Sequence, residues 1–208
     1  MTENIYTGDR RELLKYFSRD YQKVLDVGCS GGNFGALLKS RHGSSVTGIE
    51  FSPEAARAAE KKLDRVLCVD VEFPGSAFPE GPFDCIVFAD VLEHLREPLQ
   101  VLKTYAQYLK PKGVMIISVP NVRHISVVAD LLFLDEWRYQ DSGILDRTHL
   151  RFFTRKSFER LLSEAGLVVE KHDFILSLRG SRWIDRVTFG ILRGILAAQY
   201  IFVVRKEL

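Results

Sequence analysis

The sequence predicts an α/β fold in which helices cover both faces of a doubly wound, mostly parallel sheet. Two observations lead to this prediction. Five apolar segments with strand character alternate with helical segments between residues 23 and 119. The fourth of them, residues 83–90, is apolar almost throughout after Asp84, which is typical of a strand buried on both faces. Parallel strands of this kind place their carboxyl ends at one edge of the sheet, where ligands bind.

The elements follow one another in a regular order. An amphipathic segment at residues 9–19 predicts a first helix, which we expect to pack across the sheet. Ser52 and Pro53 form a typical start for a later helix, because serine caps a helix and proline fits its first turn. The predicted strands are residues 23–28, 45–50, 65–70, 83–90 and 114–119, and the helices between them are residues 32–41, 52–63 and 97–109.

The pattern changes after Pro120. Residues 121–153 contain one helical stretch, at 125–134, and then aromatic and charged residues without strand alternation. An insertion at the carboxyl edge of such a sheet is where substrate specificity is usually built, so we expect it to cover the acceptor. The remaining elements are a helix capped by Thr154 and stopped by Gly166, strands at residues 167–178 and 200–205, and a helix at residues 181–198.

The segment 181–198 carries arginines beside an apolar face. Asp185, Arg186 and Arg193 exclude a membrane span, which needs about 20 apolar residues. Packing on the sheet or on a neighbouring subunit is favoured over peripheral contact with a membrane surface, which stays open. The sequence sets no oligomeric state.

Length and composition limit the other possibilities. A chain of 208 residues is expected to form a single domain, residues 1–208. Its 29 Lys and Arg against 27 Asp and Glu give a net charge of only +2, so nucleic acid is not an expected partner. Three widely spaced cysteines and a polar N-terminal stretch unlike a signal peptide indicate buried free thiols in a cytoplasmic protein.

The most informative stretch is residues 24–35. Asp26 lies in an apolar strand that ends in the turn Gly28-Cys29-Ser30-Gly31-Gly32, and a helix follows at once. A second acid, Glu50, ends the next strand, where nucleotide-binding folds place a carboxylate for ribose hydroxyls. The dinucleotide fingerprint G-x-G-x-x-G fails, because Ser30 and Asn33 stand where glycines are needed. The stretch therefore predicts a pocket for another nucleoside-bearing cofactor.

This arrangement resembles the class I S-adenosylmethionine-dependent methyltransferases, which usually have glycine at the position of Ser30. The resemblance implies a Rossmann-like sheet of about seven strands with one antiparallel strand. It also implies S-adenosyl-L-methionine as cofactor and S-adenosyl-L-homocysteine as product. In such a site the turn would accommodate the methionine part, Asp26 would orient its ammonium group, and Glu50 would take the ribose hydroxyls. The implied cofactor residues are Asp26, Gly28, Ser30, Gly32, Glu50, Phe51, Asp70 and Val71.

Two further segments carry candidate catalytic residues. Residues 89–95 hold Asp90, Glu93 and His94, for which three interpretations compete: local capping and packing, a general base at His94 or Asp90, and a divalent-metal site. An acid-x-x-Glu-His segment of this kind is associated with a metal ion in the similar ubiquinone-pathway O-methyltransferases. We expect activity without a metal. The segment around His149 resembles the Thr-His-x-x-x-Phe region of quinone-biosynthesis and glycan or secondary-metabolite methyltransferases, which implies that His149 faces the acceptor; a purely structural histidine is an equal alternative.

The favoured function is transfer of a methyl group from S-adenosylmethionine to a hydroxyl of a small-molecule or sugar-like acceptor, with His149, His94 and Asp90 as candidate catalytic residues. Two other functions remain open. One is a regulatory module that binds the cofactor without catalysis, which would keep the turn but transfer no methyl group. The other is a nicotinamide-dependent oxidoreductase, which the missing glycine disfavours.

Overall fold

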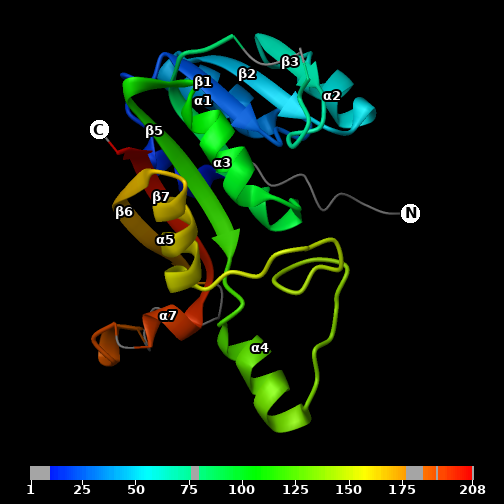
Figure 1. The fold of residues 1–208 in the computed structure, drawn as a ribbon, viewed down its shortest axis with the longest axis vertical. Helices are drawn as coiled ribbons and strands as arrows, with labels where there is room; N and C mark the ends of the chain where they lie inside the picture. Colours follow the sequence, from blue (N-terminus) through cyan, green and yellow to red (C-terminus); the bar gives the residue numbers. More distant parts are fainter. Residues whose placement is uncertain (1–9, 76–79, 177–184, 191, 208) are drawn as a thin grey trace.

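A computed structural model describes residues 10–75, 80–176, 185–190 and 192–207 of the chain. Its centre is a seven-stranded sheet with the order β3-β2-β1-β4-β5-β7-β6 (Figure 1). The sheet confirms the predicted fold class. Its strands are β1 (Lys23–Val27), β2 (Ser45–Glu50), β3 (Arg65–Cys68), β4 (Phe83–Ala89), β5 (Leu109–Pro120), β6 (Leu167–Leu176) and β7 (Ala197–Lys206).

Strands β1 to β5 run parallel to one another, and β7 runs antiparallel to both of its neighbours, β5 and β6. The single antiparallel strand agrees with the prediction. In the register Val27 pairs with Ile49 and with Phe88, so the carboxyl ends of β1, β2 and β4 lie at the same edge. Strand β5 begins at Leu109, five residues before its predicted start, because the segment after the preceding helix pairs at once with Phe83 of β4.

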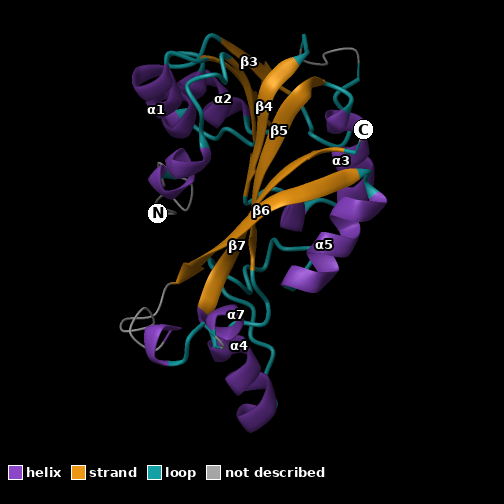
Figure 2. Cartoon of the chain, turned by 90° about the vertical axis from the view of Figure 1, so that its left-hand side faces the viewer, coloured by secondary structure: helices purple, strands orange, loops and turns teal. Residues whose placement is uncertain are grey.

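Helices cover both faces of the sheet, as Figure 2 shows. One face is covered by α1 (Asn33–His42), α2 (Pro53–Ala59) and the N-terminal η1 (Arg11–Tyr16). The other is covered by α3 (Pro98–Ala106) and α5 (Arg155–Glu164). Each face buries its own apolar cluster: Leu13, Phe34 and Leu38 pack on the first, and Leu102, Phe158 and Leu162 pack on the second. A sheet buried on both faces holds its strand ends rigidly, which fixes the site at their carboxyl edge.

The helices at the two ends of the chain differ from the prediction. The first is a 3₁₀ helix of six residues rather than an α-helix over 9–19, and residue 9 lies outside the described part. A single helix over 181–198 is wrong for the residues that the structure describes. Phe189 and Gly190 take positive φ angles, which turn the chain, and only α7 (Arg193–Leu196) follows before β7 begins at Ala197. Residues 177–184 lie outside the described part.

The insertion after β5 extends beyond the carboxyl edge of the sheet (Figure 1). It contains α4 (Ile125–Ala129) and the π-helical turn η3 (Asp130–Leu134), which confirm the predicted helical stretch. The rest of the insertion, to residue 153, is mainly loop, with Trp137 and Tyr139 packed against Phe152. Among the described helices, none is long and apolar enough to cross a membrane.

Candidate active site

The glycine turn between β1 and α1 adopts a conformation that only small residues tolerate well. Gly28, Ser30 and Gly32 all have positive φ angles, of 72°, 48° and 75°. A Cβ atom on Gly28 would lie 2.6 Å from the side chain of Val91, so any larger residue would clash as well as being strained. Ser30 has its positive φ angle at the position where the class I methyltransferases usually have glycine. The turn therefore brings bare backbone to the end of β1, as a cofactor loop requires.

The side chain of Glu50 connects this turn to the start of α2. One carboxylate oxygen accepts from the Ser30 amide and the other from the Ser52 amide, each at 2.8 Å. The Ile49 carbonyl holds the same turn through the amides of Gly28 and Cys29. Each carboxylate oxygen has a second lone pair, so Glu50 can still accept hydroxyl groups from a ligand.

Asp26 is a buried carboxyl group beneath the turn. Its side chain is 2% exposed, and its Oδ2 atom has no hydrogen-bond partner in the part of the chain that the structure describes. Burial, together with the nearby charge of Glu50, raises the pKa of Asp26 to about 7. A cationic ammonium group would supply the missing donor and stabilise the ionised form. The residues around the turn thus fit the methionine end of S-adenosylmethionine.

The other predicted cofactor residues lie at the ends of β2 and β3. Phe51 follows β2 with 71% of its surface exposed, and so leaves a ring face free for a nucleobase. Asp70 accepts from the Glu72 amide at 2.8 Å in the turn after β3, and the adjacent Val71 is buried. The structure therefore brings all eight predicted cofactor residues to one edge of the sheet.

Asp90 has a positive φ angle at the end of β4 and is held by three side chains. It forms an ion pair with Arg10 and accepts from Ser118 and Gln199, each at 2.8 Å. Through these bonds its carboxylate connects the N-terminal segment with β5 and β7. It would have to give up these bonds to act as a base.

His94 and His149 come together although 55 positions separate them. Their ring centroids are 4.7 Å apart, and one nitrogen of each ring lies within 4.8 Å of a Glu93 carboxylate oxygen. Backbone contacts hold this arrangement, because the amides of Leu150 and Arg151 both donate to the Glu93 carbonyl, at 2.8 and 2.9 Å. The two predicted catalytic segments therefore form one cluster, which we call the Glu93–His94–His149 cluster.

Hydrogen bonds assign the proton on each ring. Nδ1 of His149 lies 3.0 Å from the Ile144 carbonyl, and Nδ1 of His94 lies 3.3 Å from the Thr148 carbonyl. A carbonyl oxygen only accepts, so both Nδ1 atoms carry protons, and in the neutral rings both Nε2 atoms carry lone pairs. Each ring can accept a proton on Nε2.

Burial dominates the electrostatics of the cluster. Glu93 is fully buried, neither of its carboxylate oxygens has a hydrogen-bond partner among the described residues, and desolvation raises its pKa to about 8. Burial and the neighbouring His149 lower the pKa of His94. At neutral pH the cluster therefore holds a protonated carboxylic acid beside a neutral imidazole.

The metal interpretation of residues 89–95 requires Asp90, Glu93 and His94 to converge. The three side chains do not converge. Asp90 is bound to Arg10, Ser118 and Gln199 and lies outside the cluster. Within the described residues, the set with metal-ligand spacing contains His149 in its place, and Glu93 would first have to lose its proton.

Sequence patterns missed several residues that shape the site. Arg10, Ser118 and Gln199 reach Asp90 from segments far apart in the chain, and no spacing rule connects them. Lys62 binds the Gly31 carbonyl and the Asn33 side chain and so supports the glycine turn from the segment that follows α2. The sequence pattern assigns Glu93 either to local capping and packing or to a metal site, although a carboxylate inside an apolar segment is itself a signal of an unusual environment.

Comparison with known proteins agrees with this geometry. The sequence model of a family described as a methyltransferase domain matches residues 4–172. The ubiquinone biosynthesis O-methyltransferase of Xanthomonas campestris is 34% identical over 104 residues, which are 48% of this chain and 43% of that protein. The mitochondrial ubiquinone biosynthesis O-methyltransferase of Rattus norvegicus is 31% identical over 159 residues, 71% of this chain and 45% of that protein. The chain thus spans less than half the length of these curated relatives.

A solved structure supports the fold. A S-adenosylmethionine-dependent methyltransferase from Archaeoglobus fulgidus superposes with a TM-score of 0.69 at 19% identity, covering 94% of this chain and 91% of that chain. The family match covers most of the sequence and contains the whole glycine turn. The chain therefore belongs to the methyltransferase domain family and has the fold of the class I S-adenosylmethionine-dependent methyltransferases.

Proposed function

We propose that the protein transfers a methyl group from S-adenosylmethionine to a hydroxyl group of a small-molecule acceptor. The observation that carries this proposal is the arrangement of two sites along one sheet edge. The glycine turn with Asp26 and Glu50 lies at the ends of β1 and β2, and the imidazole rings of His94 and His149 lie beyond the end of β4. Family membership favours methyl transfer over nicotinamide chemistry.

The residues around the turn would hold the cofactor by its two ends. Asp26 would pair with the ammonium group, the backbone of Gly28, Ser30 and Gly32 would surround the methionine chain, and Glu50 would accept from the ribose hydroxyls. Phe51 would cover the adenine face, and Asp70 and Val71 would meet its edge. When bound, the cofactor supplies an electrophilic methyl group on a positively charged sulfur.

His149 would act on the acceptor. Its Nε2 lone pair would take the hydroxyl proton as the acceptor oxygen bonds to the methyl carbon and the carbon–sulfur bond breaks, leaving the electron pair on sulfur. A positioned base of this kind contributes about 10²- to 10⁴-fold. His94 would serve as the neighbouring second base, and Asp90 would hold the N-terminal segment against the strand ends.

The insertion, residues 121–153, would close over the acceptor and exclude water. Its support is its place at the carboxyl edge and its exposed apolar side chains, among them Phe133 with 83% of its surface exposed. The relatives named as ubiquinone biosynthesis O-methyltransferases support an organic hydroxyl as the acceptor.

Methyl transfer from labelled S-adenosylmethionine to a panel of hydroxylated phenols, sugars and carboxylic acids would test this function, with calorimetric titration of S-adenosylhomocysteine alongside. We expect micromolar binding of the product and transfer to at least one acceptor class. Binding without transfer to any acceptor would favour a regulatory module, and absence of binding would contradict the proposal.

A further inference from the structure

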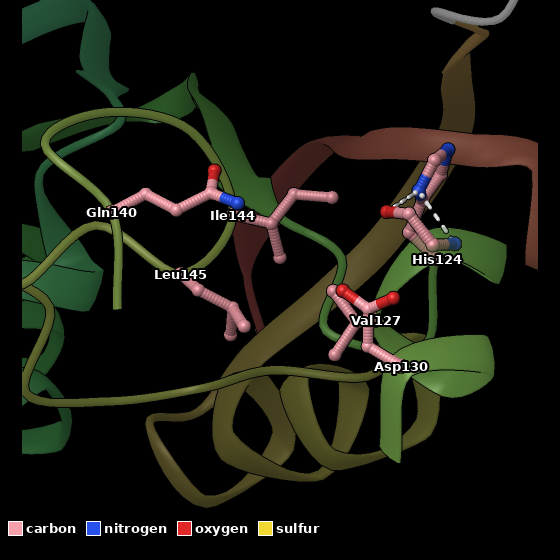
Figure 3. Close-up of a pocket in the computed structure, with 7 residues that line it drawn as sticks. His124, Val127, Asp130, Gln140, Ile144 and Leu145 are labelled. Carbon is pink, nitrogen blue, oxygen red and sulfur yellow. Dashed lines mark hydrogen bonds between the residues drawn. The ribbon is translucent and has the colours of Figure 1, made fainter. Parts of the chain in front are cut away.

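A pocket lies inside the insertion, apart from the glycine turn. Figure 3 shows it between helix α4 with the start of η3 on one side and the loop that follows Gln140 on the other. Its volume is about 140 Å³. A cavity of about 150 Å³ can bind benzene, so this volume gives room for one small ring.

The pocket is lined by apolar walls and by polar side chains. Val127, Ile144 and Leu145 form the walls. The Asp130 carboxylate and the Gln140 side-chain amide both line the pocket, and neither has a hydrogen-bond partner in the described part of the chain. Carboxylate oxygens only accept, so Asp130 suits a ligand that donates, whereas the Gln140 amide both accepts and donates. His124 also lines the pocket, and its buried Nε2 atom has no hydrogen-bond partner among the described residues.

His124 and Ser126 fix one wall of the pocket. His124 is 4% exposed and caps α4, because its Nδ1 atom accepts from the Ser126 amide at 3.3 Å. The Ser126 hydroxyl lies 2.8 Å from the same nitrogen and must donate to it, which leaves the hydroxyl oxygen free to accept. Ser126 therefore adds one more acceptor to the lining.

The pocket is joined to the proposed base by a single residue. The side chain of Ile144 lines the pocket, and the carbonyl of Ile144 accepts the Nδ1 proton of His149 at 3.0 Å. The opposite end of the loop is closed by the backbone amide of Gln140, which donates to the Leu145 carbonyl at 2.9 Å. A ligand that moves this loop would also move the ring of His149.

We propose that this pocket is a recognition subsite for a part of the acceptor rich in hydrogen-bond donors, either a hydroxylated ring or an amine. Asp130, Gln140 and Ser126 would accept its hydroxyl or amino protons, and the three apolar walls would pack against its C–H face. The proposal rests on the proposed function, because it assigns the pocket to the acceptor of that reaction.

Direct binding tests the subsite without knowledge of the full acceptor. The probes are methyl glucoside for a hydroxylated ring, cyclohexylamine for an amine and toluene for a ring without a hydrogen-bond donor, each titrated to ~10 mM by ligand-observed NMR with S-adenosylhomocysteine present. The variants are Asp130→Ala, Asp130→Asn and Gln140→Leu. Glu136→Ala is the matched control, since it removes an exposed carboxylate that does not line the pocket.

We expect methyl glucoside or cyclohexylamine to bind and to lose at least tenfold in affinity in Asp130→Ala, while Glu136→Ala stays within twofold. Asp130→Asn distinguishes the two kinds of ligand, because it removes the charge and keeps an oxygen that accepts. The variant should keep most of the affinity for methyl glucoside and lose the affinity for cyclohexylamine. No binding of either probe, or binding that Asp130→Ala and Gln140→Leu leave unchanged, would overturn the subsite. Preferential binding of toluene, which has no donor, would do the same.

The two proposals fail in different ways. Titration of S-adenosylhomocysteine on the same samples reads the cofactor site, which lies outside the pocket, and Asp130→Ala should leave that affinity unchanged. A wild-type protein that binds methyl glucoside in the pocket but not S-adenosylhomocysteine would contradict the proposed function and leave the pocket in place.

Discussion

The proposed cofactor half of the site, around the glycine turn, and the proposed acceptor half, around Asp90 and the Glu93–His94–His149 cluster, are built in different ways. Around the glycine turn the contacts are short in sequence: Glu50 reaches Ser30 and Ser52, and Ile49 closes the turn at Gly28. In the acceptor half the contacts are long in sequence. His94 meets Thr148, and Asp90 binds Gln199, which is 109 residues away.

This difference implies that a substitution in one half can leave the structure of the other half unchanged. The proposed cofactor half consists of one turn and the ends of β1, β2 and β3, which are fixed by a sheet that is buried on both faces. The acceptor half depends on how the insertion docks onto the segment after β4. Changes in one half should therefore leave the other half's function largely intact, and the following experiments test that separation.

The largest effect is expected for Glu50→Ala. The variant removes the charged acceptor for two ribose hydroxyls and also frees the Ser30 amide. At roughly 1.5–3 kcal/mol for each charged hydrogen bond, the affinity for S-adenosylhomocysteine should fall about 10²- to 10⁴-fold. Calorimetry measures the affinity, with Glu60→Ala as the control for loss of an exposed acid. Unchanged affinity would remove Glu50 from the cofactor site.

His149→Ala should act on turnover and leave the cofactor half intact. We expect turnover to fall about 100-fold, the low end for a general base, because His94 remains as a second acceptor of protons. The affinity for S-adenosylhomocysteine should change little. The control is His172→Ala, an exposed histidine on β6.

A purely structural His149 would behave differently from a base. It would lower the melting temperature, the turnover and the cofactor affinity together, whereas a base lowers mainly turnover. Wild-type turnover in His149→Ala would end its assignment as the base and return attention to His94.

Glu93→Gln should change how stability depends on pH. The pKa of Glu93 rises from 4.5 in the unfolded chain to about 8 in the fold, so the folded state binds the extra proton between these values. The stabilisation is present below pH 4.5 and is lost as the pH rises through 8, at up to about 1.4 kcal/mol per pH unit.

The variant cannot titrate at this position, so its stability relative to the wild type should increase from pH 5 to pH 8. Denaturant unfolding at several pH values measures the difference. The slope due to Asp26, whose pKa is raised to about 7, should persist in both proteins. A difference that stays constant with pH would show that Glu93 is already ionised in the fold.

The smallest effect is expected for chelation. Glu93 is protonated at neutral pH and Asp90 is bound elsewhere, so treatment with a chelator should leave turnover within twofold of its starting value. Loss of activity in chelator and recovery with a divalent ion would instead make Glu93, His94 and His149 ligands of that ion.

The arrangement of the residues in the proposed cofactor half was predictable from the sequence because its signals are local. A strand, a turn of small residues and an acid at the next strand end can be read within about 30 positions, and the structure brings Asp26, Gly28 and Glu50 together as expected. Strand β2 was predicted with its observed bounds, Ser45–Glu50. Periodicity and turn residues carry this information directly.

The acceptor half was predicted less completely because its contacts are tertiary. His94 and His149 were each identified, but no pattern shows that they meet, or that Arg10 binds Asp90. The helix predicted over 181–198 failed for a related reason. The ion pair of Asp185 with Arg193 and the turn at Gly190 prevail over the apolar periodicity.

Hydrogen exchange with and without S-adenosylhomocysteine tests the separation of the two halves most directly. Binding should slow exchange at the amides of residues 28–32 and 50–52, at the ends of β1 and β2, and leave residues 124–150 of the insertion nearly unchanged. Protection confined to the insertion, or equal protection of both segments, would contradict the account in which the cofactor half forms a site of its own.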